Sequence, residues 1–434
     1  MSLPELIEIV PLKEPVRAEE ITVPGSKSIT NRALILAALA EGKTTLLGAL
    51  WSEDTQVMVE CLQRLGFEVH VTSDLEESCN RTITVQGLGG KIFLGGTEAQ
   101  PLDLFVGNAG TAARFLSAFV CLGEGTYRLH GVPRMHQRPQ AALFKALREL
   151  GYQVDSTNDK LPVVIHGIGP KAGKCKVSIE ESSQFASALL LCAKKGGWTI
   201  EITGENSEES PYVAMTSKLI EAFPKNGGSF PIEPDASSGS YFWGSSSLLS
   251  NKRMKLHPSG MGHTIRVLHW PLSPWQIDAE FPKFLPLRSS ISREGQLGDS
   301  IMTAIVLAPF AVKSIRFTDL GRLRVQECER VEALRTELTK CGAKVIETGD
   351  TLEVFPSKLH GAEIETYNDH RMAMCFAILG LKVTGIKIKN PACVKKTFPN
   401  FFQKLAAAPP HGLGATILDA QTRQPLSGEE LFAD

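Results

Sequence analysis

The chain has 434 residues, of which 43% are hydrophobic and 21% are charged, a composition typical of a globular protein with two or three domains. Its 46 basic and 47 acidic side chains give a net charge of -1, so no global field favours nucleic acid or an anionic membrane. The nine cysteines are an odd number without a CxxC pair, and no apolar run reaches the roughly 20 residues that span a bilayer. We therefore expect no disulfide framework, zinc site or membrane span.

One pattern recurs along the chain: a turn of small or polar residues precedes an almost wholly apolar run. Six copies can be read: GSKSITNRALILAALA from Gly25, GNAGTAARFLSAFVCL from Gly107, ESSQFASALLLCA from Glu181, DASSGSYFWGSSS from Asp235, GDSIMTAIVLAPFA from Gly298 and NDHRMAMCFAILGL from Asn368. Each apolar run predicts a helix. Several copies continue into a glycine turn and an alternating strand, as in EGKTTLLGAL, GEGTYRLHG, KGGWTIEITG and VTGIKIKNP.

Three copies continue further, into an amphipathic helix that ends in glycine before another strand: CLQRLGFEVHV, ALRELGYQVD and ELTKCGAKVIE. The fourth copy is degenerate. Its continuation, NKRMKLHPSGMGHTIRVLHWPLSPWQIDAEF, contains three prolines and predicts no clear second helix.

A helix that is apolar on every face must be buried on every face, so the first helix of each copy should lie inside. Strands and amphipathic helices would then cover these helices. The polar turns would aim unsatisfied N–H groups and positive dipole ends at one place, which attracts phosphates and carboxylates. The alternative is that the Ser, Asn and Asp residues before the apolar runs are ordinary N-caps.

The turns also carry cations. VPGSKSITNR places Lys27, Ser28 and Arg32 within two turns of a helix start, which suits the oxygens of one or two anions, although the spacing is not that of a P-loop. NDHRMAM adds Arg371 at another helix start, and Lys396 follows in KKTFP. These groups predict a local anion site in a chain without net positive charge.

Two further segments contribute charged candidates. PRMHQRP contains Arg138, and RVQECER places Glu327 and Arg330 three residues apart, which predicts one helical face for both. Each could instead be a surface arginine or an ordinary salt-bridged patch. The ten histidines show no HxxxH or HExxH spacing, so we expect neither a metal nor a cofactor.

In this order, the phrases PGSKSITNRAL, GNAGTA, RP after the arginine, SSQF, PDASS, NDHRMAM and KTFP resemble the 3-phosphoshikimate 1-carboxyvinyltransferase family from about Ile21 to Leu405. The resemblance implies the α/β enolpyruvyl transferase fold. This is a two-domain inside-out α/β barrel, in which each domain has three βαβαββ-type repeats with buried parallel helices. It also implies that residues 1–20 and 235–434 form one domain and residues 21–234 the other, with the active site in the cleft between them.

The resemblance further implies which residues form the site. The shikimate 3-phosphate side matches Lys27, Ser28, Arg32, Ser182, Ser183, Gln184, Tyr212 and Asp299. The phosphoenolpyruvate side matches Lys27, Asn108, Gly110, Arg138, Gln184, Arg330, Arg371 and Lys396. Asp299 and Glu327 match two catalytic carboxylates, and Lys27 is expected to act with Glu327 or compete with it. Gly110 is expected to gate the inhibitor glyphosate.

The match departs from the family on the shikimate 3-phosphate side. Gln326 replaces a lysine and Arg322 stands where asparagine is usual, so we expect both to bind shikimate 3-phosphate, with the charge moved rather than lost. NSEESPY is one residue longer than usual, which makes Ser207 or Ser210 a possible ligand. The fourth copy lacks the SxQGD phrase and offers PWQID near Asp278. The segment after Leu405 is a tail without a chemical signal.

Two alternatives stay open. A second family with this fold transfers the same group to a UDP-amino sugar, but its opening phrase has Asn where this chain has Ser28, and its reactive cysteine is absent from PRMHQRP. A non-catalytic relative would bind a phosphorylated metabolite, which retention of Lys27, Asp299 and Glu327 disfavours. We expect shikimate 3-phosphate and phosphoenolpyruvate as partners and no nucleic acid or membrane. Because MSLPELIEIVPLKEP lacks the pattern of a signal peptide, we also expect a cytoplasmic protein, as a monomer.

Overall fold

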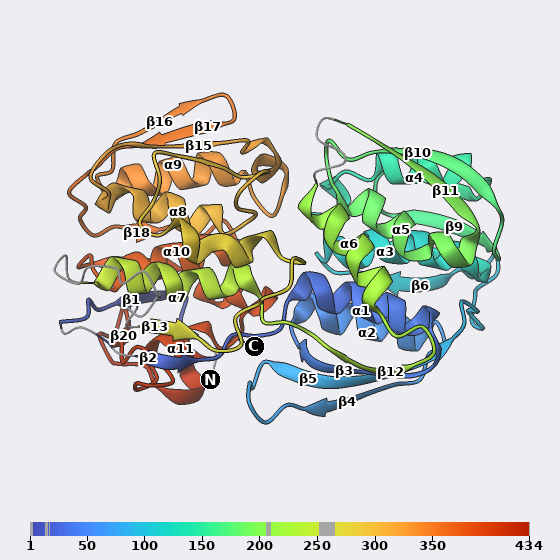
Figure 1. Cartoon of the computed structure of the whole chain (residues 1–434), viewed down its shortest axis with the longest axis horizontal. Helices are drawn as coiled ribbons and strands as arrows, with labels where there is room; N and C mark the ends of the chain where they lie inside the picture. The colour runs from blue at the N-terminus through green and yellow to red at the C-terminus, as the bar shows by residue number, and fades with distance from the viewer. Residues whose placement is uncertain (1–2, 14–15, 17, 205–209, 251–264, 434) are drawn as a thin grey trace. The chain divides into compact units, whose positions relative to one another are not determined.

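The computed structural model describes residues 3–13, 16, 18–204, 210–250 and 265–433. Ser207 and the first part of the degenerate continuation of the fourth copy, residues 251–264, lie outside these residues. The chain forms two compact units, unit 1 comprising Met1–Pro24 and Pro234–Asp434 and unit 2 comprising Gly25–Glu233 (Figure 1). No helix in the described ranges is long and apolar enough to cross a membrane.

Unit 2 contains the first three copies of the repeated pattern. Its helices and strands are, in chain order, α1 (Lys27–Leu39), β3 (Glu41–Leu50), α2 (Glu53–Arg64), β4 (Val69–Ser73), β5 (Asn80–Leu88), β6 (Leu102–Phe105), α3 (Gly110–Phe119), β7 (Glu124–His130), α4 (Ala141–Glu149), β8 (Gln153–Asp155), β9 (Val163–Ile168), β10 (Gly173–Ser178), α5 (Gln184–Gly196), β11 (Trp198–Thr203), α6 (Pro211–Ala222) and β12 (Gly228–Pro231).

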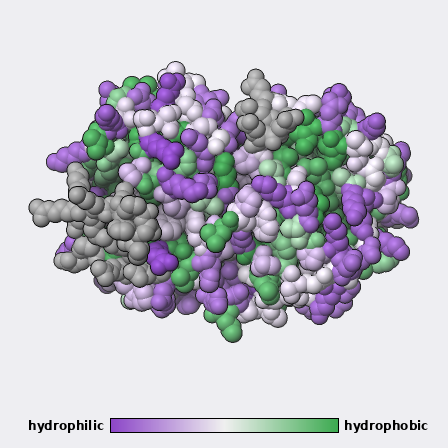
Figure 2. Space-filling view, viewed as in Figure 1, coloured by the Kyte–Doolittle hydropathy of each residue, from purple (hydrophilic) through white to green (hydrophobic). Residues whose placement is uncertain are grey.

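The apolar helices α1, α3 and α5 lie inside unit 2 and pack against one another. Every residue of α3 is buried, and so is every residue of α1 from Ile29 to Leu39. The amphipathic helix α2 instead buries one side, which includes Met58 and Leu62, and exposes Glu60. Hydrophilic residues dominate the surface of both units in Figure 2. The predicted arrangement, with apolar helices inside and strands outside, is confirmed.

The sheets of unit 2 repeat one hydrogen-bonding pattern. In β6-β7-β9-β8 the first pair is parallel and the next two are antiparallel, and β12-β3-β5-β4 has the same order of pairings. The third copy contributes only the parallel pair β10 and β11. Since β12 comes last in the unit and pairs with β3, the end of unit 2 completes the sheet of its first copy.

Unit 1 is built in the same way from both ends of the chain. Its elements are β1 (Leu6–Ile9), β2 (Ala18–Ile21), α7 (Ala236–Leu249), β13 (Ile265–Val267), η3 (Ile277–Phe284), β14 (Ser290–Ser292), α8 (Ile301–Leu307), β15 (Ile315–Thr318), η5 (Gly321–Val325), α9 (Arg330–Lys340), β16 (Val345–Thr348), β17 (Thr351–Val354), β18 (Glu363–Ile364), α10 (His370–Gly380), β19 (Ile386–Lys389), η6 (Pro391–Lys396), α11 (Phe401–Ala406), β20 (Ile417–Asp419) and η7 (Gly428–Leu431), where η marks a 3-10 helix.

Unit 1 also encloses three apolar helices. α7, α8 and α10 contact one another, and all residues of α8 and α10 are buried. The sheets β14-β15-β17-β16 and β18-β19-β1-β20 each have one parallel pair followed by two antiparallel pairs, and β13 and β2 form a parallel pair. In the described part of the continuation of the degenerate fourth copy, from residue 265 onward, the chain forms the short strand β13 and the 3-10 helix η3.

The C-terminal tail, which has no chemical signal in the sequence, takes part in the packing of unit 1. Its strand β20 pairs antiparallel with β1, with Ile417 opposite Ile9. Ile417 and Leu431 are buried, whereas Gln421, in the turn that follows β20, is exposed. The tail thus covers one edge of the sheet that contains the N-terminal strand.

We expect Ile417→Ala to lower the free energy of unfolding by about 2–5 kcal/mol, because it removes buried methyl groups and leaves a cavity beside β1. Chemical denaturation monitored by circular dichroism measures this change. The control is Gln421→Ala, which should stay within about 0.5 kcal/mol of the parent as a surface change. Equal stability of both variants would contradict a packing role for the tail.

Candidate active site

The buried guanidinium of Arg330 joins three carboxylates in unit 1. Arg330 is only 1% exposed, and its Nε lies 2.7 Å from Oδ2 of Asp369. Its Nη2 lies 2.8 Å from Oε2 of Glu327, and its Nη1 lies 3.9 Å from Oδ2 of Asp299. Nη1 also donates a hydrogen bond to the side-chain oxygen of Gln326. Four residues from three segments are therefore held around one cation.

The prediction that Glu327 and Arg330 share one helical face was wrong. Helix α9 begins at Arg330, and the carboxylate of its N-cap, Glu329, accepts a hydrogen bond from the backbone N–H of Glu332. Glu327 precedes the helix, in the turn after η5. The cap decides where the helix starts, because its side chain satisfies a donor of the first turn. The ion pair between Glu327 and Arg330 forms nonetheless, across this turn.

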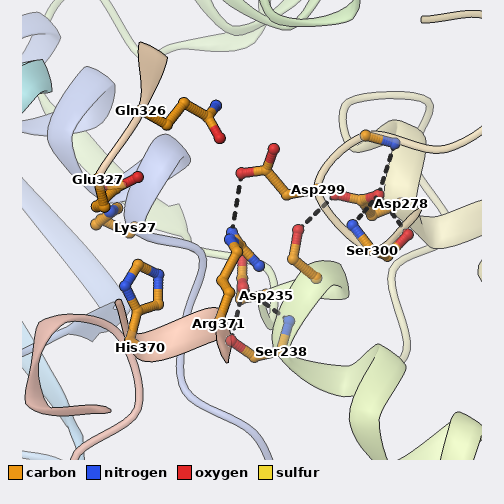
Figure 3. Close-up of polar contacts among 12 residues, drawn as sticks. Lys27, Asp235, Ser238, Asp278, Asp299, Ser300, Gln326, Glu327, His370 and Arg371 are labelled. Atoms are coloured by element: carbon orange, nitrogen blue, oxygen red, sulfur yellow. Dashed lines mark hydrogen bonds and ion pairs between the residues drawn. The ribbon is translucent and has the colours of Figure 1, made fainter. Parts of the chain in front are cut away.

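Asp299 lies just before α8 and faces three arginines. Its carboxylate oxygens lie 3.2 Å from Nη2 of Arg371 (Figure 3) and 3.0 Å from Nη2 of Arg293, in addition to the longer contact with Arg330. Burial alone would raise the pKa of Asp299, but the charges of Arg371, Arg293 and Arg330 outweigh burial and hold that pKa well below its usual value. Asp299 is therefore an ionised carboxylate held by cations.

Glu327 has a similar environment, with two cations near it. Besides Arg330, Nζ of Lys396 lies 3.4 Å from its Oε1. Lys396 ends η6 and is buried.

Asp369 holds the start of α10, because its Oδ1 accepts the backbone N–H of Arg371 at 2.8 Å. The structure thus brings the two predicted catalytic carboxylates together with the three cations of unit 1 that were assigned to phosphoenolpyruvate.

Arg322 lies on η5, beside this cluster. It is half-buried, and burial together with the nearby charge of Arg293 lowers its pKa, while Glu294 acts in the opposite direction. Arg293, whose charge acts on Arg322, contacts Asp299 at 3.0 Å, whereas Gln326 accepts a hydrogen bond from Arg330.

Arg32 is the most buried cation of unit 2. Its Nε donates to Oγ1 of Thr216 at 2.7 Å, its Nη2 to Oγ of Ser187 at 3.1 Å, and its Nη1 to the backbone oxygen of Ser28 at 2.9 Å. No carboxylate among the described residues pairs with it, and burial lowers its pKa to about 10. These contacts tie α1 to α5 and α6. A buried cation is costly unless an anion lies near it. The burial of Arg32 therefore supports anion binding near the starts of α1, α5 and α6.

Lys27, at the first position of α1, pairs with a residue that the sequence interpretation missed. Its Nζ lies 3.1 Å from Oδ2 of Asp54, a buried residue in the first turn of α2. In the sequence, Asp54 looks like an ordinary acid at a helix start, where it complements the dipole. Only the packing of α1 against α2 shows that it orients Lys27.

The start of α5 is connected to α3 through Gln184. Its side-chain oxygen accepts from Nη1 of Arg114 at 2.7 Å, and its backbone N–H donates to Oγ of Ser182 at 3.2 Å. Ser183 is the buried N-cap residue of α5. Tyr212, half-buried in the first turn of α6, contacts this region through its backbone oxygen, which accepts from Oγ of Ser187 at 3.4 Å.

Arg138 and Gly110 form a close contact at the start of α3. Arg138 is buried, which excludes the alternative of a surface arginine, and its Nη1 donates to the backbone oxygen of Asn108 at 3.0 Å. A methyl group added at Gly110 would stand 2.7 Å from Nη1 of Arg114 and 2.8 Å from Nη2 of Arg138. A side chain at this position would therefore displace at least one of the two guanidinium groups, which approach the backbone closely.

The predicted residues therefore gather in two clusters, one in each unit. Four further residues belong to them that the sequence did not single out as ligands: Asp54 and Arg114 in unit 2, and Arg293 and Asp278 in unit 1. Ser210, which was considered as a ligand, is buried as the N-cap residue of α6. Within the described ranges, no group of three or more His, Cys, Asp or Glu side chains could hold a metal ion.

Similar sequences with one name support a family assignment. A family model described as EPSP synthase (3-phosphoshikimate 1-carboxyvinyltransferase) matches residues 13–226 and 295–405. A 3-phosphoshikimate 1-carboxyvinyltransferase from Opitutus terrae is 38% identical over 94% of this chain and 98% of the relative. One from Trichormus variabilis is 35% identical over 92% and 98%, respectively.

Solved structures agree on the fold. An EPSP synthase from Acinetobacter baumannii matches with a TM-score of 0.70 at 22% identity, over 95% of this chain and 100% of the other. The enolpyruvyl transferase NikO from Streptomyces tendae matches with a TM-score of 0.66 at 15% identity, over 99% and 100%. The α/β enolpyruvyl transferase fold is therefore confirmed, and with the family model and the relatives above, the chain belongs to the 3-phosphoshikimate 1-carboxyvinyltransferase (EPSP synthase) family.

Proposed function

We propose that the chain transfers the enolpyruvyl group of phosphoenolpyruvate to the 5-hydroxyl of shikimate 3-phosphate and releases phosphate. Family membership supports this reaction. The observation that carries it is the buried cluster of unit 1, where two candidate proton-transfer groups, Asp299 and Glu327, lie among Arg330, Arg371 and Lys396. We further propose that it acts in the cytoplasm as a monomer.

The charges of the two clusters suit the two substrates. Phosphoenolpyruvate carries a carboxylate and a phosphate, which planar arginine forks and a lysine neutralise well. In unit 1, Arg330, Arg371 and Lys396 have these side chains. In unit 2, Lys27 lies at the start of α1 and the guanidinium of Arg138 lies at the start of α3, beside Asn108 and Gly110. The N–H groups of helix starts favour anions, and Ser28, Ser182 and Gln184 add polar groups for shikimate 3-phosphate. The proposal requires both clusters to act on one pair of substrates.

The chemistry needs two proton transfers in each of two steps. In the first, Asp299 takes the proton of the 5-hydroxyl, Glu327 gives a proton to C3 of phosphoenolpyruvate, and the hydroxyl oxygen forms a bond with C2. In the second step, the C2–phosphate bond of this tetrahedral intermediate breaks, C3 returns its proton to Glu327, and phosphate leaves with the proton that Asp299 took, so both carboxylates regain their starting protonation states. Holding both reactants in register contributes up to roughly 7–11 kcal/mol.

Asp299 can serve as a base only when its ion pairs loosen. Without substrate, Arg371, Arg293 and Arg330 stabilise its ionised form and hold its pKa low, although burial opposes them. The carboxylate and phosphate of phosphoenolpyruvate would compete with Asp299 for Arg371 and Arg330. Binding of this substrate should therefore raise the pKa of Asp299 and make it a better proton acceptor.

Phosphate release measured with both substrates, and with each omitted, tests the function. Release that requires both shikimate 3-phosphate and phosphoenolpyruvate supports it. Binding without turnover would instead support a non-catalytic relative, and turnover only with a UDP-amino sugar would support the second enolpyruvyl transferase family. Neither alternative is favoured by the names of the relatives.

We expect Asp299→Asn to lower turnover by roughly 10²–10⁴, because a neutral amide cannot take the hydroxyl proton. The affinity for shikimate 3-phosphate should stay within roughly tenfold, since the amide keeps the shape of the side chain. Phosphate release and isothermal titration calorimetry measure the two quantities. Asp419→Asn is the control and should keep full turnover, because Asp419 ends β20 and its carboxylate accepts backbone N–H groups of the turn that follows, those of Gln421 and Thr422. Normal turnover of the Asp299 variant would exclude it as the base.

Gly110→Ala should raise the KM for phosphoenolpyruvate roughly tenfold, because the methyl group displaces Arg138 and costs about one hydrogen bond to a charged group. The KM for shikimate 3-phosphate should change much less. The control is Gly173→Ala in the same unit, where the new methyl group meets only Leu150 within 3.4 Å. If glyphosate inhibition weakens while both KM values stay normal, Gly110 is only a steric gate for the inhibitor.

A further inference from the structure

Asp278 is a buried carboxylate to which neither the sequence pattern nor the family model gives a role. It is 4% exposed and lies at the start of η3, in the PWQID segment. The matched ranges, residues 13–226 and 295–405, leave this segment out. Such a group needs several hydrogen-bond donors, because burying an unsatisfied carboxylate is costly.

Four donors surround this carboxylate, and three of them come from one turn. Oδ1 of Asp278 accepts the backbone N–H of Gly298 at 2.8 Å, the backbone N–H of Ser300 at 3.1 Å and the hydroxyl of Ser300 at 2.5 Å. Oδ2 accepts the hydroxyl of Ser237 on α7. Figure 3 shows Asp278 and Ser300 beside Asp299. The residue between the two bonded backbone groups is Asp299 itself.

We propose that Asp278 is a positioning residue for catalysis: it fixes the turn Gly298–Ser300 from both sides of Asp299 and so holds that carboxylate in place. This role rests on the proposed function of Asp299 as the base. The backbone oxygen of Asp299 accepts the N–H of Met302 at 3.2 Å, so α8 holds the turn on one side, and Asp278 joins the turn to η3 on the other. The side chain of Asp299 extends from this doubly held turn to Arg371 and Arg293.

Gly298 supports this inference independently. A methyl group built on Gly298 would lie 3.0 Å from Oδ2 of Asp278 and 3.0 Å from Cγ2 of Ile277. The turn therefore approaches the carboxylate as closely as a side-chain-free residue allows. A substitution at this position must push the turn away from Asp278 or move the carboxylate.

The same segment also holds the start of α7. Oε1 of Gln276 accepts the backbone N–H of Ala236 at 3.0 Å, and its Nε2 donates to the backbone oxygen of Pro234 at 2.9 Å. Gln276 and Asp278 thus connect the starts of two buried helices that are far apart in the sequence. This connection supports the hydrogen bonds from the turn Gly298–Ser300 to Asp278, because α7 is packed against α8 inside unit 1.

Asparagine in place of Asp278 should preserve the hydrogen bonds to the turn Gly298–Ser300. Burial, and then the charge of Asp299, raise the pKa of Asp278, so a neutral side chain is tolerated at this position. The amide oxygen of asparagine can accept the same three hydrogen bonds from Gly298 and Ser300. Its amide nitrogen can donate to the hydroxyl of Ser237, whose hydrogen rotates to suit.

The test compares kcat and KM of folded variants. Asp278→Ala should lower kcat by roughly 10- to 100-fold with little change in either KM, because a displaced catalytic group can cost about 10²-fold in rate. Asp278→Asn should restore most of this loss. The control is Glu337→Ala, which removes another fully buried carboxylate of unit 1, one that binds Lys340 and Tyr367, and should lower stability but not kcat.

A double variant distinguishes positioning from a general structural role. In the Asp299→Asn background, Asp278→Ala should cause little further loss, since the group that it positions is already inactive. Full additivity, or normal kcat for Asp278→Ala, would overturn the proposal. If Asp278→Ala does not fold, Gly298→Ala replaces it and should also lower kcat; normal kcat there would overturn the proposal. An inactive parent protein would instead contradict the proposed function.

Discussion

The guanidinium of Arg330 connects carboxylates from three places in unit 1: Asp299 before α8, Glu327 before α9 and Asp369 at the cap of α10. Each of these carboxylates would be costly to bury alone, and a buried ion pair that loses one partner typically costs about 3–5 kcal/mol. The starts of three helices therefore depend electrostatically on one side chain. A change at Arg330 should affect both the packing of unit 1 and its chemistry.

The arginines in the cluster of unit 2 donate to neutral acceptors, whereas those in the cluster of unit 1 contact carboxylates. Arg32 is surrounded by hydroxyl and carbonyl oxygens rather than carboxylates, and Arg114 and Arg138 donate to an amide oxygen and to backbone oxygens. Lys27 pairs with an acidic residue, Asp54. Neutral acceptors satisfy hydrogen bonds without cancelling charge, so this cluster keeps its attraction for anions. In unit 1, by contrast, acids that take part in the proposed chemistry occupy the cations until substrate arrives.

The fold could be predicted from the sequence because its strongest signal is simple. A run such as that of α1 or α10, apolar on all sides, allows only an interior position, and each run begins at a polar turn. The polar partners could not be predicted in the same way. Asp278 binds a turn 20 residues away, and Arg114 binds Gln184 at a separation of 70 residues. No periodic pattern encodes such pairs, because they depend on how the helix starts are packed. The prediction that Glu327 lies on a helix was wrong for a related reason. The side chain of Glu329 caps the first turn of α9, so the helix begins at Arg330 and does not extend back to Glu327.

The order of strands along the chain has a consequence for synthesis on the ribosome. All of unit 2 is contiguous, from Gly25 to Glu233, and β12 at its end supplies the missing edge of its first sheet. In unit 1, β1 lies between β19 and β20. The strand β1 is therefore synthesised early, whereas the two strands that pair with it are synthesised near the end of the chain. Pairings between such distant residues form slowly, because the loop between them must close first. Unit 2 can therefore complete its fold while unit 1 is still being translated. During that time β1 cannot pair with β19 and β20, because they have not yet been synthesised.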